Sequence, residues 1–110
     1  MAIRMTHATA LILQALATNR RHGFQIMDVT GLPSGTVYPV LRRLEREEAV
    51  ESEWEDGEVA SQAGRRPRRV YRLTESGQSL AERARERLAE TARLLAGGGL
   101  GGVPSRANGS

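Results

Sequence analysis

Two short helix patterns open the chain. Over residues 6–19, apolar side chains recur at the spacing of one helix face, and Thr6 stands where it can cap the first turn. A second helix is expected over residues 23–30, with four side chains available for burial: Phe24, Ile26, Met27 and Val29. The glycine and proline that follow end it, because glycine accepts a left-handed cap conformation and proline cannot continue a helix.

Residues 34–48 predict a third helix with two chemically different faces. Ser34 or Thr36 can cap its first turn. The apolar face, which is expected to be buried, carries Val37, Val40, Leu41 and Leu44. The opposite face presents hydroxyls, a phenol and two guanidiniums, on Ser34, Thr36, Tyr38, Arg42 and Arg43. These groups suit phosphates and base edges, although arginines are also ordinary on the wet face of a surface helix. Two helices, a tight turn and an amphipathic helix follow one another as in a helix-turn-helix unit.

A β-hairpin is expected after the third helix. Residues 50–55 alternate apolar and acidic side chains at the period of a strand with one wet face, and residues 68–73 form the second strand. Residues 56–64 between them are polar with glycines near both ends, which favours a loop. Trp54, the one tryptophan, is expected to pack in the core or against the wing. The expected fold class is therefore mainly α with a small β-hairpin, a winged helix-turn-helix.

The last helix begins near Thr74, which can cap it. Its apolar stripe has nearly coiled-coil spacing and is expected to join two copies of the chain through Leu80, Ala84, Leu88, Ala92 and Leu95. The expected organisation is a winged helix-turn-helix DNA-binding domain over residues 1–73, a dimerisation helix over 74–96 and a flexible tail without a function over 97–110.

Charge is distributed unevenly along the chain, although the net charge is only +3. All the basic residues are arginines, which a codon bias explains in large part, so their positions carry more information than their identity. Five arginines fall within residues 65–72, whereas acidic residues concentrate over 45–58. Arg65 and Arg66, expected at the hairpin tip, have no acidic neighbour in the sequence and favour DNA contact. The alternative is cross-strand pairing with the glutamates of the first strand, which we expect for Arg72.

Several functional classes find no support in the sequence. The chain has no cysteine, and neither His7 nor His22 stands at metal-ligand or catalytic spacing from a partner. We therefore expect no enzyme, no metal and no cofactor, and interpret His22 as a residue that fixes a helix–helix turn. No apolar run has the roughly 20 residues that span a bilayer, and the start has no apolar core of a secretory signal. A cytoplasmic protein without a membrane partner is expected.

The two longest motifs resemble the PadR-like family of winged-helix transcriptional regulators. Residues 34–45 (SGTVYPVLRRLE) are similar to the family's recognition helix, and residues 68–77 (RRVYRLTESG) to its wing strand and the following cap. A weaker likeness lies at residues 22–24 (HGF). Three departures are a Glu48-Ala49 pair where the family commonly has glycine, a short second helix, and the lack of a larger C-terminal helical domain.

The resemblance implies a homodimeric repressor that binds double-stranded operator DNA with two-fold symmetry. Some family members release DNA when a small phenolic molecule or a hydrophobic drug binds, so a small-molecule effector is one alternative, and a winged helix used only for protein contact is another. Tyr38 is expected either to contact a phosphate or to pack under the wing. The candidate DNA-binding residues are Ser34, Gly35, Thr36, Tyr38, Arg42, Arg43, Arg65, Arg66, Arg68 and Arg69.

Overall fold

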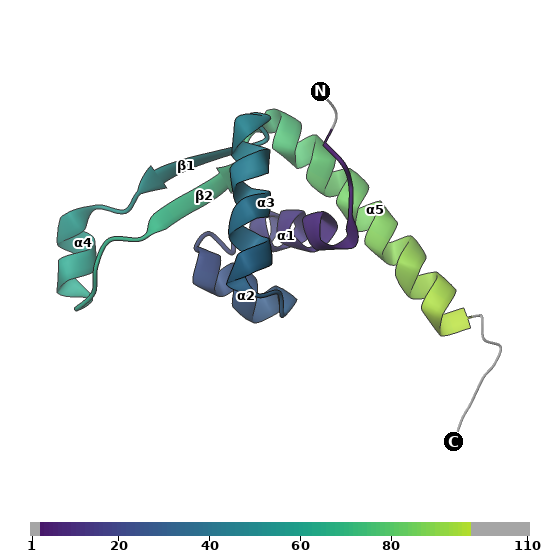
Figure 1. Cartoon of the computed structure of the whole chain (residues 1–110), viewed down its shortest axis with the longest axis horizontal. Helices are drawn as coiled ribbons and strands as arrows, with labels where there is room; N and C mark the ends of the chain where they lie inside the picture. The colour runs from purple at the N-terminus through teal and green to yellow at the C-terminus, as the bar shows by residue number, and fades with distance from the viewer. Residues whose placement is uncertain (1–2, 98–110) are drawn as a thin grey trace, which may run out of the picture.

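The computed structural model describes residues 3–97 as five helices and one two-stranded hairpin (Figure 1). The elements in chain order are α1 (His7–Ala17), α2 (Gly23–Thr30), α3 (Ser34–Arg46), β1 (Val50–Trp54), α4 (Gly57–Gln62), β2 (Arg69–Leu73) and α5 (Glu75–Gly97). The expected fold class is confirmed, since α1 to α3 form the helix-turn-helix unit and the hairpin is its wing. The expected tail over 97–110 lies, apart from Gly97, outside the described residues.

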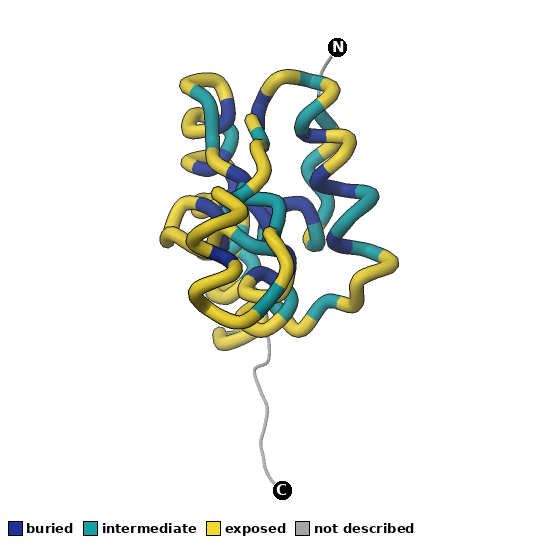
Figure 2. Tube along the Cα trace, turned by 90° about the vertical axis from the view of Figure 1, so that its left-hand side faces the viewer, coloured by how far each residue is buried: buried dark blue, intermediate teal, exposed yellow. Residues whose placement is uncertain are grey.

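The core lies where α1, α2 and α3 meet the base of the hairpin and the first half of α5. The apolar stripe expected on α3 is buried, and so is Ile26 of α2. On α1 the burial extends to Leu13, beyond the predicted face, because α2 and α3 pack on one side of α1 and α5 packs along another. Figure 2 shows these buried positions interspersed with exposed ones along the helices. Phe24 and Val29 of α2 were expected to be available for burial, yet both are exposed.

The two ends of α3 differ from the sequence prediction. Neither Ser34 nor Thr36 caps its start. Pro33 is the N-cap residue, and its carbonyl accepts the N–H groups of Thr36 and Val37, both at 3.0 Å. At the other end Glu48 adopts a left-handed backbone with φ of 63°, the position that glycine usually fills. The helix is thereby closed by two backbone bonds: the N–H of Ala49 donates to Leu44 at 2.9 Å, and that of Glu48 donates to Glu45 at 3.0 Å.

The hairpin is antiparallel, with Val50 opposite Leu73, Ser52 opposite Tyr71 and Trp54 opposite Arg69. Its base is fixed to the helical unit, because the Tyr71 N–H donates to the Arg21 carbonyl at 2.9 Å. The side chains of Val50 and Tyr71 are buried there. Trp54 lies further out and is 64% exposed, so of its two expected places the core is wrong. It contacts the wing instead, where the Arg69 guanidinium carbon lies 5.2 Å from its ring centroid.

The connection expected to be a loop contains the short helix α4. Asp56 caps it by accepting the Glu58 N–H at 2.8 Å, and Ala60 is fully buried. The sequence did not reveal this helix because six residues with a glycine at the start carry no complete apolar period.

Helix α5 begins at the cap expected from the sequence, since the Thr74 hydroxyl accepts the Gly77 N–H at 3.1 Å. Its first half packs along α1, where the Gln14 amide donates to the Ala81 carbonyl at 3.1 Å. Ala84 is fully buried inside this protomer, so its expected place in an interface between copies was wrong. Leu80 and Leu88 are half-buried against the same core. Among residues 3–97, no helix is both long and apolar enough to cross a membrane.

Candidate nucleic-acid interface

The outward face of α3 carries the polar residues predicted from the sequence. Ser34 and Gly35 are exposed in its first turn, and Arg42 and Arg43 are exposed near its middle. Thr36 is half-buried. The buried stripe on the opposite side fixes the rotation of α3, so these groups project away from the core.

Tyr38 lies between α3 and the start of α2. A Cβ atom at Gly23 would lie 2.1 Å from the Tyr38 hydroxyl oxygen, so the ring packs directly on the glycine backbone. The side chain is half-buried and reaches the surface beside the hairpin. Its packing therefore matches one of the two expectations for Tyr38, while a phosphate contact stays a prediction.

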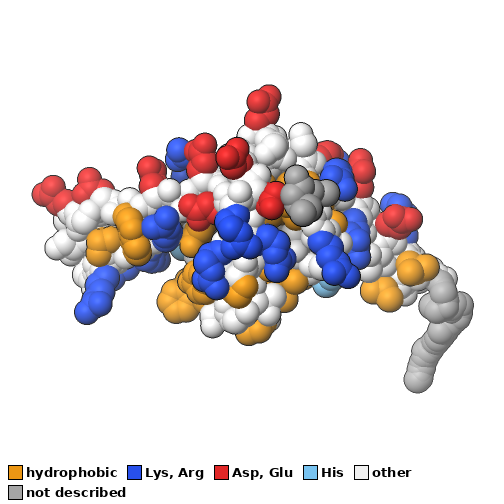
Figure 3. Space-filling view, turned by 45° about the horizontal axis from the view of Figure 1, so that its top comes forward, with side chains coloured by type: hydrophobic (Ala, Val, Ile, Leu, Met, Phe, Trp, Pro, Cys, Tyr) orange, Lys and Arg blue, Asp and Glu red, His pale blue; other side chains and the backbone are white. Residues whose placement is uncertain are grey.

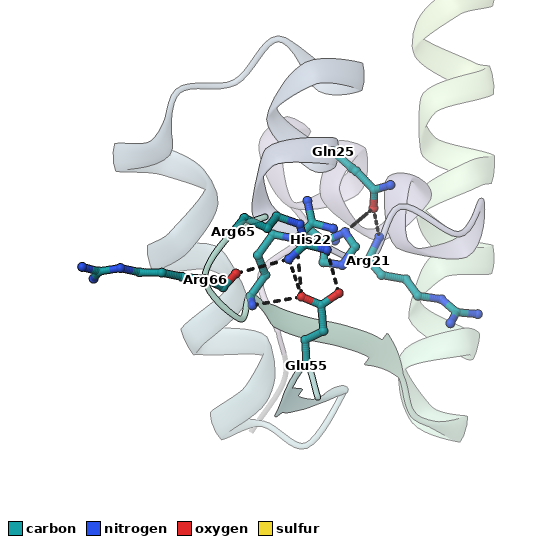
Figure 4. A network of polar contacts seen from close by, with 7 residues as sticks. Arg21, His22, Gln25, Glu55, Arg65 and Arg66 are labelled. Carbon is teal, nitrogen blue, oxygen red and sulfur yellow. Dashed lines mark hydrogen bonds and ion pairs between the residues drawn. The ribbon is translucent and has the colours of Figure 1, made fainter. Parts of the chain in front are cut away.

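The start of α2 is fixed by a local polar cluster. The Gln25 side-chain oxygen accepts the N–H groups of Arg21 at 2.8 Å and of His22 at 3.2 Å, and its distance to His22 Nδ1 is 3.0 Å (Figure 4). His22 precedes the first residue of α2 as its N-cap residue. This arrangement supports the interpretation that His22 fixes the turn between α1 and α2.

Arg65 is bound to the carboxylate of Glu55, as in the alternative of pairing with the glutamates of the first strand. Its guanidinium pairs with both oxygens of Glu55, with Nη2 at 2.8 Å from Oε2 (Figure 4). The Arg68 N–H also donates to Glu55, at 3.3 Å. These bonds, led by that from Arg65, lower the pKa of Glu55 from 4.5 to about 2. The sequence hid this pair because α4 brings residues ten positions apart to the same end of the hairpin.

Arg69 contacts a hydroxyl, an aromatic ring and a carboxylate at once. Arg69 donates to Ser52 Oγ at 3.0 Å, and its guanidinium carbon lies 5.2 Å from the centroid of the Trp54 ring. Its Nη2 also lies 3.7 Å from a carboxylate oxygen of Glu45 on α3.

Arg72 pairs with Glu51 at 3.1 Å and with Glu53 at 3.5 Å, as expected for a strand residue. Arg66 is exposed and has no ion pair within the described part of the chain. Figure 4 shows its side chain extending away from Glu55. Arg66 is therefore the hairpin guanidinium most available to a new anion.

A groove with a volume of about 570 Å³ separates α2 from the hairpin. We call it the α2–hairpin groove. Its apolar wall includes Phe24, Met27, Tyr38 and Trp54, and its basic wall is formed by Arg65, Arg66, Arg68 and Arg69. The Nε atom of Arg68 is buried in this region without a hydrogen-bond partner. Sequence reasoning missed Phe24 and Trp54 as surface residues, because periodicity alone assigns large apolar side chains to the core.

The acidic side chains occupy a different side of the molecule from most of these arginines. Glu51 and Glu53 alternate with Ser52 and Trp54 along β1 and therefore project from the opposite face of the hairpin. In Figure 3 most carboxylates line the upper edge of the view, and arginines gather below them. Among residues 3–97, no three metal-ligating side chains come together.

A helix-turn-helix unit with a polar third helix beside an arginine-bearing hairpin defines the winged-helix class of DNA-binding proteins. A PadR family transcription regulator from Clostridium difficile R20291 superposes with a TM-score of 0.65 at 21% identity, over 80% of this chain and 95% of that chain. The sequence matches the model of the PadR-like transcriptional regulator family over residues 12–83. The chain belongs to this family, and it is a member of a class of transcriptional regulators.

Other solved structures share the fold. PcaV from Streptomyces coelicolor, solved with its natural ligand, has a TM-score of 0.65 at 21% identity, over 81% of this chain and 59% of that chain. ZitR from Lactococcus lactis, solved with DNA, has a TM-score of 0.62 at 17% identity, over 84% of this chain and 58% of that chain. The present chain thus spans about three fifths of the length of these two regulators. No curated protein matches the sequence.

Proposed function

We propose that this chain is a homodimeric repressor that binds a two-fold operator in double-stranded DNA. Each protomer places the first turns of α3 in a major groove, and the arginine-bearing hairpin contacts the adjacent backbone or minor groove. The observation that carries the proposal is that α3 and the hairpin arginines lie side by side, since one groove is bordered by Tyr38, Arg65, Arg66, Arg68 and Arg69. A role on operator DNA agrees with the cytoplasmic location expected from the sequence.

The residues proposed to contact DNA have distinct roles. Ser34, Gly35 and Thr36 stand at the start of α3, where a recognition helix meets base edges, with Tyr38 one turn further. Arg42 and Arg43 are exposed and anchor a phosphate or read a guanine. On the hairpin, Arg66 provides the open charge, whereas Arg65, Arg68 and Arg69 are partly engaged with carboxylates.

The second half of α5 is proposed to join the two protomers. The buried residues of α5 all lie in its first half, and Figure 1 shows the second half extending away from the helical unit. Ala92, Leu94 and Leu95 are exposed there, and Leu88 is half-buried at the edge of the core. Burying these side chains against a second copy removes apolar surface from water. A two-fold dimer then requires half-sites one helical turn, or a multiple of it, apart.

The test of this proposal measures binding of the full chain to the DNA upstream of its own gene across a salt series. Arg42→Ala and Arg43→Ala are expected to weaken operator binding, and a lost phosphate contact reduces the salt slope by about one unit. Arg83→Ala is the matched control, because Arg83 is an exposed arginine of α5, which lies outside the elements proposed to contact DNA. If neither α3 variant differs from the control, or if footprinting shows a single site without two-fold symmetry, the proposal is wrong.

A ligand-responsive repressor is a second candidate. PcaV was solved with its natural ligand, and DNA binding by BpsR from Bordetella bronchiseptica is regulated by 6-hydroxynicotinic acid. BpsR has a TM-score of 0.64 at 21% identity, over 87% of this chain and 67% of that chain. A panel of phenolic acids added to the protein–operator complex tests this candidate, and release of DNA by one of them supports it.

A further inference from the structure

We propose that the α2–hairpin groove binds single-stranded DNA, a function beyond recognition of the duplex by α3. The groove offers two chemical features on one surface, namely exposed aromatic rings and four arginines, of which Arg66 has no ion pair within residues 3–97. An unpaired nucleotide presents the complementary pair, a planar base and a phosphate.

Two aromatic side chains of this groove are unusually open to water. Phe24 on α2 is 72% exposed and Trp54 at the end of β1 is 64% exposed, and both border the same 570 Å³ volume. Trp54 is also held in place, because the Arg69 guanidinium lies 5.2 Å from its ring centroid and is itself bonded to Ser52. A ring that is oriented by a cation and otherwise exposed provides a platform on which a planar group stacks.

The charge of the groove selects an anion. Four arginines border it, and the one carboxylate bound to them near the hairpin end is Glu55. Glu55 neutralises Arg65 first, as the paired geometry and the lowered pKa of its carboxyl show. Arg68 Nε is buried 3.9 Å from a Glu55 carboxylate oxygen and is not open to a new ligand. Arg66 is exposed and has no ion pair within residues 3–97. A phosphodiester backbone supplies acceptors to Arg66.

Single-stranded DNA fits these features better than a duplex does. In a duplex the faces of the bases are stacked on one another, so that only base edges, sugars and phosphates meet a protein. Unpaired bases expose their faces and stack on aromatic side chains, while a basic groove follows their backbone. The volume of the groove is in the range that holds one drug-sized molecule, which is about the size of a nucleotide.

The test uses the full chain and fluorescein-labelled dT12, with fluorescence anisotropy as the readout. Trp54→Ala and Phe24→Ala are each expected to weaken dT12 binding by roughly 5- to 100-fold, the usual effect of losing one base–aromatic stack. Trp54→Phe is expected to restore most of the affinity, because it keeps a ring on the hairpin. Val59→Ala, an exposed apolar residue of α4 outside the groove, is the matched control and is expected to bind dT12 like the parent chain.

A second readout is the fluorescence of Trp54, which is the one tryptophan of the chain and is expected to be quenched by unlabelled dT12. The proposal is overturned if the aromatic variants bind dT12 as tightly as the control, which would leave only a general attraction to the arginines. It is also overturned if poly-glutamate displaces dT12 as effectively as unlabelled dT12, or if free dTMP binds the groove and dT12 does not.

The two proposals fail separately. Arg42→Ala and Arg43→Ala are expected to weaken operator binding but leave dT12 binding within about twofold of the parent chain. If these two α3 variants lose dT12 binding to the same extent as Trp54→Ala, the single strand binds to α3. That result would overturn the proposal that it binds in the α2–hairpin groove. A chain that ignores the operator yet binds dT12 through Trp54 would refute only the repressor proposal.

Discussion

Gly77 marks the closest approach between α5 and the end of the helix-turn-helix unit. A Cβ atom at this position would lie 1.9 Å from the Ala49 carbonyl oxygen and 3.2 Å from Leu73 Cδ2. The carbonyl has little freedom to move, because it accepts the Thr74 N–H at 3.0 Å. Gly77→Ala therefore forces the backbone to shift where the connection after α3 meets α5.

The expected result is a loss of about 1–3 kcal/mol in the free energy of unfolding, the range for overpacking a well-packed site. The gain of up to about 1 kcal/mol that alanine brings to a helix interior offsets only part of the overpacking cost. Urea unfolding followed by circular dichroism measures the difference. Because the contact is with backbone rather than with the end of a flexible side chain, rearrangement of neighbouring side chains does not relieve it.

Gly35→Ala is the matched control for this prediction. Gly35 is also near the start of a helix, but a Cβ atom there would meet no atom within 4 Å. The control is expected to be neutral or to stabilise the protein slightly. Equal stability of the Gly77→Ala and Gly35→Ala proteins would refute the reasoning that α5 is positioned by backbone contact with Ala49.

Three further predictions concern the helix ends, the hairpin and α5. Glu48→Gly is expected to stabilise the protein by about 0.5–1 kcal/mol in urea unfolding, because glycine adopts the φ of 63° without strain. Stability from the Arg65–Glu55 pair is expected to be present above pH 4.5 and to be lost as the pH falls toward 2, since folding lowers the pKa of Glu55 to about 2. The free energies of unfolding of the parent chain and of Glu55→Gln should therefore become equal as the pH falls through this range. Replacing Leu94 and Leu95 with Asp is expected to give monomers in sedimentation experiments.

Each of these predictions has a matched comparison. Asn19 also has a positive φ, of 69°, but asparagine tolerates this conformation, so Asn19→Gly should gain less stability than Glu48→Gly. If the parent chain and Glu55→Gln differ in their free energy of unfolding by the same amount from pH 7 to pH 2, the lowered pKa of Glu55 is contradicted. Val59→Asp is the control for the Asp variant at Leu94 and Leu95, because it also replaces an exposed apolar residue with Asp but lies on α4. If both Asp variants have the same oligomeric state, α5 does not join the protomers.

The ion pairs within the hairpin are expected to influence how DNA binding depends on salt concentration. Glu55 holds Arg65, and Glu45 lies near Arg69, so the hairpin presents fewer open charges than its sequence suggests. A duplex that approaches the hairpin competes with these glutamates for guanidiniums already oriented by them. Arg66 is free of this competition, and its replacement is expected to have the largest effect on the salt slope among the hairpin arginines.

The order of the elements was determined by the sequence itself. Apolar spacing in α1 and α3, the strand alternation around Ser52 and the cap at Thr74 are local features, and the structure confirms each of them. Such features act through the backbone and side chains of a few neighbouring residues, so they can be recognised without knowledge of the fold. The two motifs that resemble the PadR-like family lie in these same elements, and the family match confirms the identification.

The tertiary structure decided which side chains meet. The packing of one element against another determines several features of the molecule. These are the burial of Ala84, the exposure of Trp54 and Phe24, and the bond between Arg65 and Glu55. A heptad-like stripe on α5 has the same spacing whether it faces α1 or a second copy of the chain, so the sequence pattern did not distinguish the two. The α2–hairpin groove likewise joins residues that are far apart in the sequence, such as Phe24, Trp54 and Arg66. They meet because the base of the hairpin is fixed to the helical unit, where the Tyr71 N–H donates to the Arg21 carbonyl.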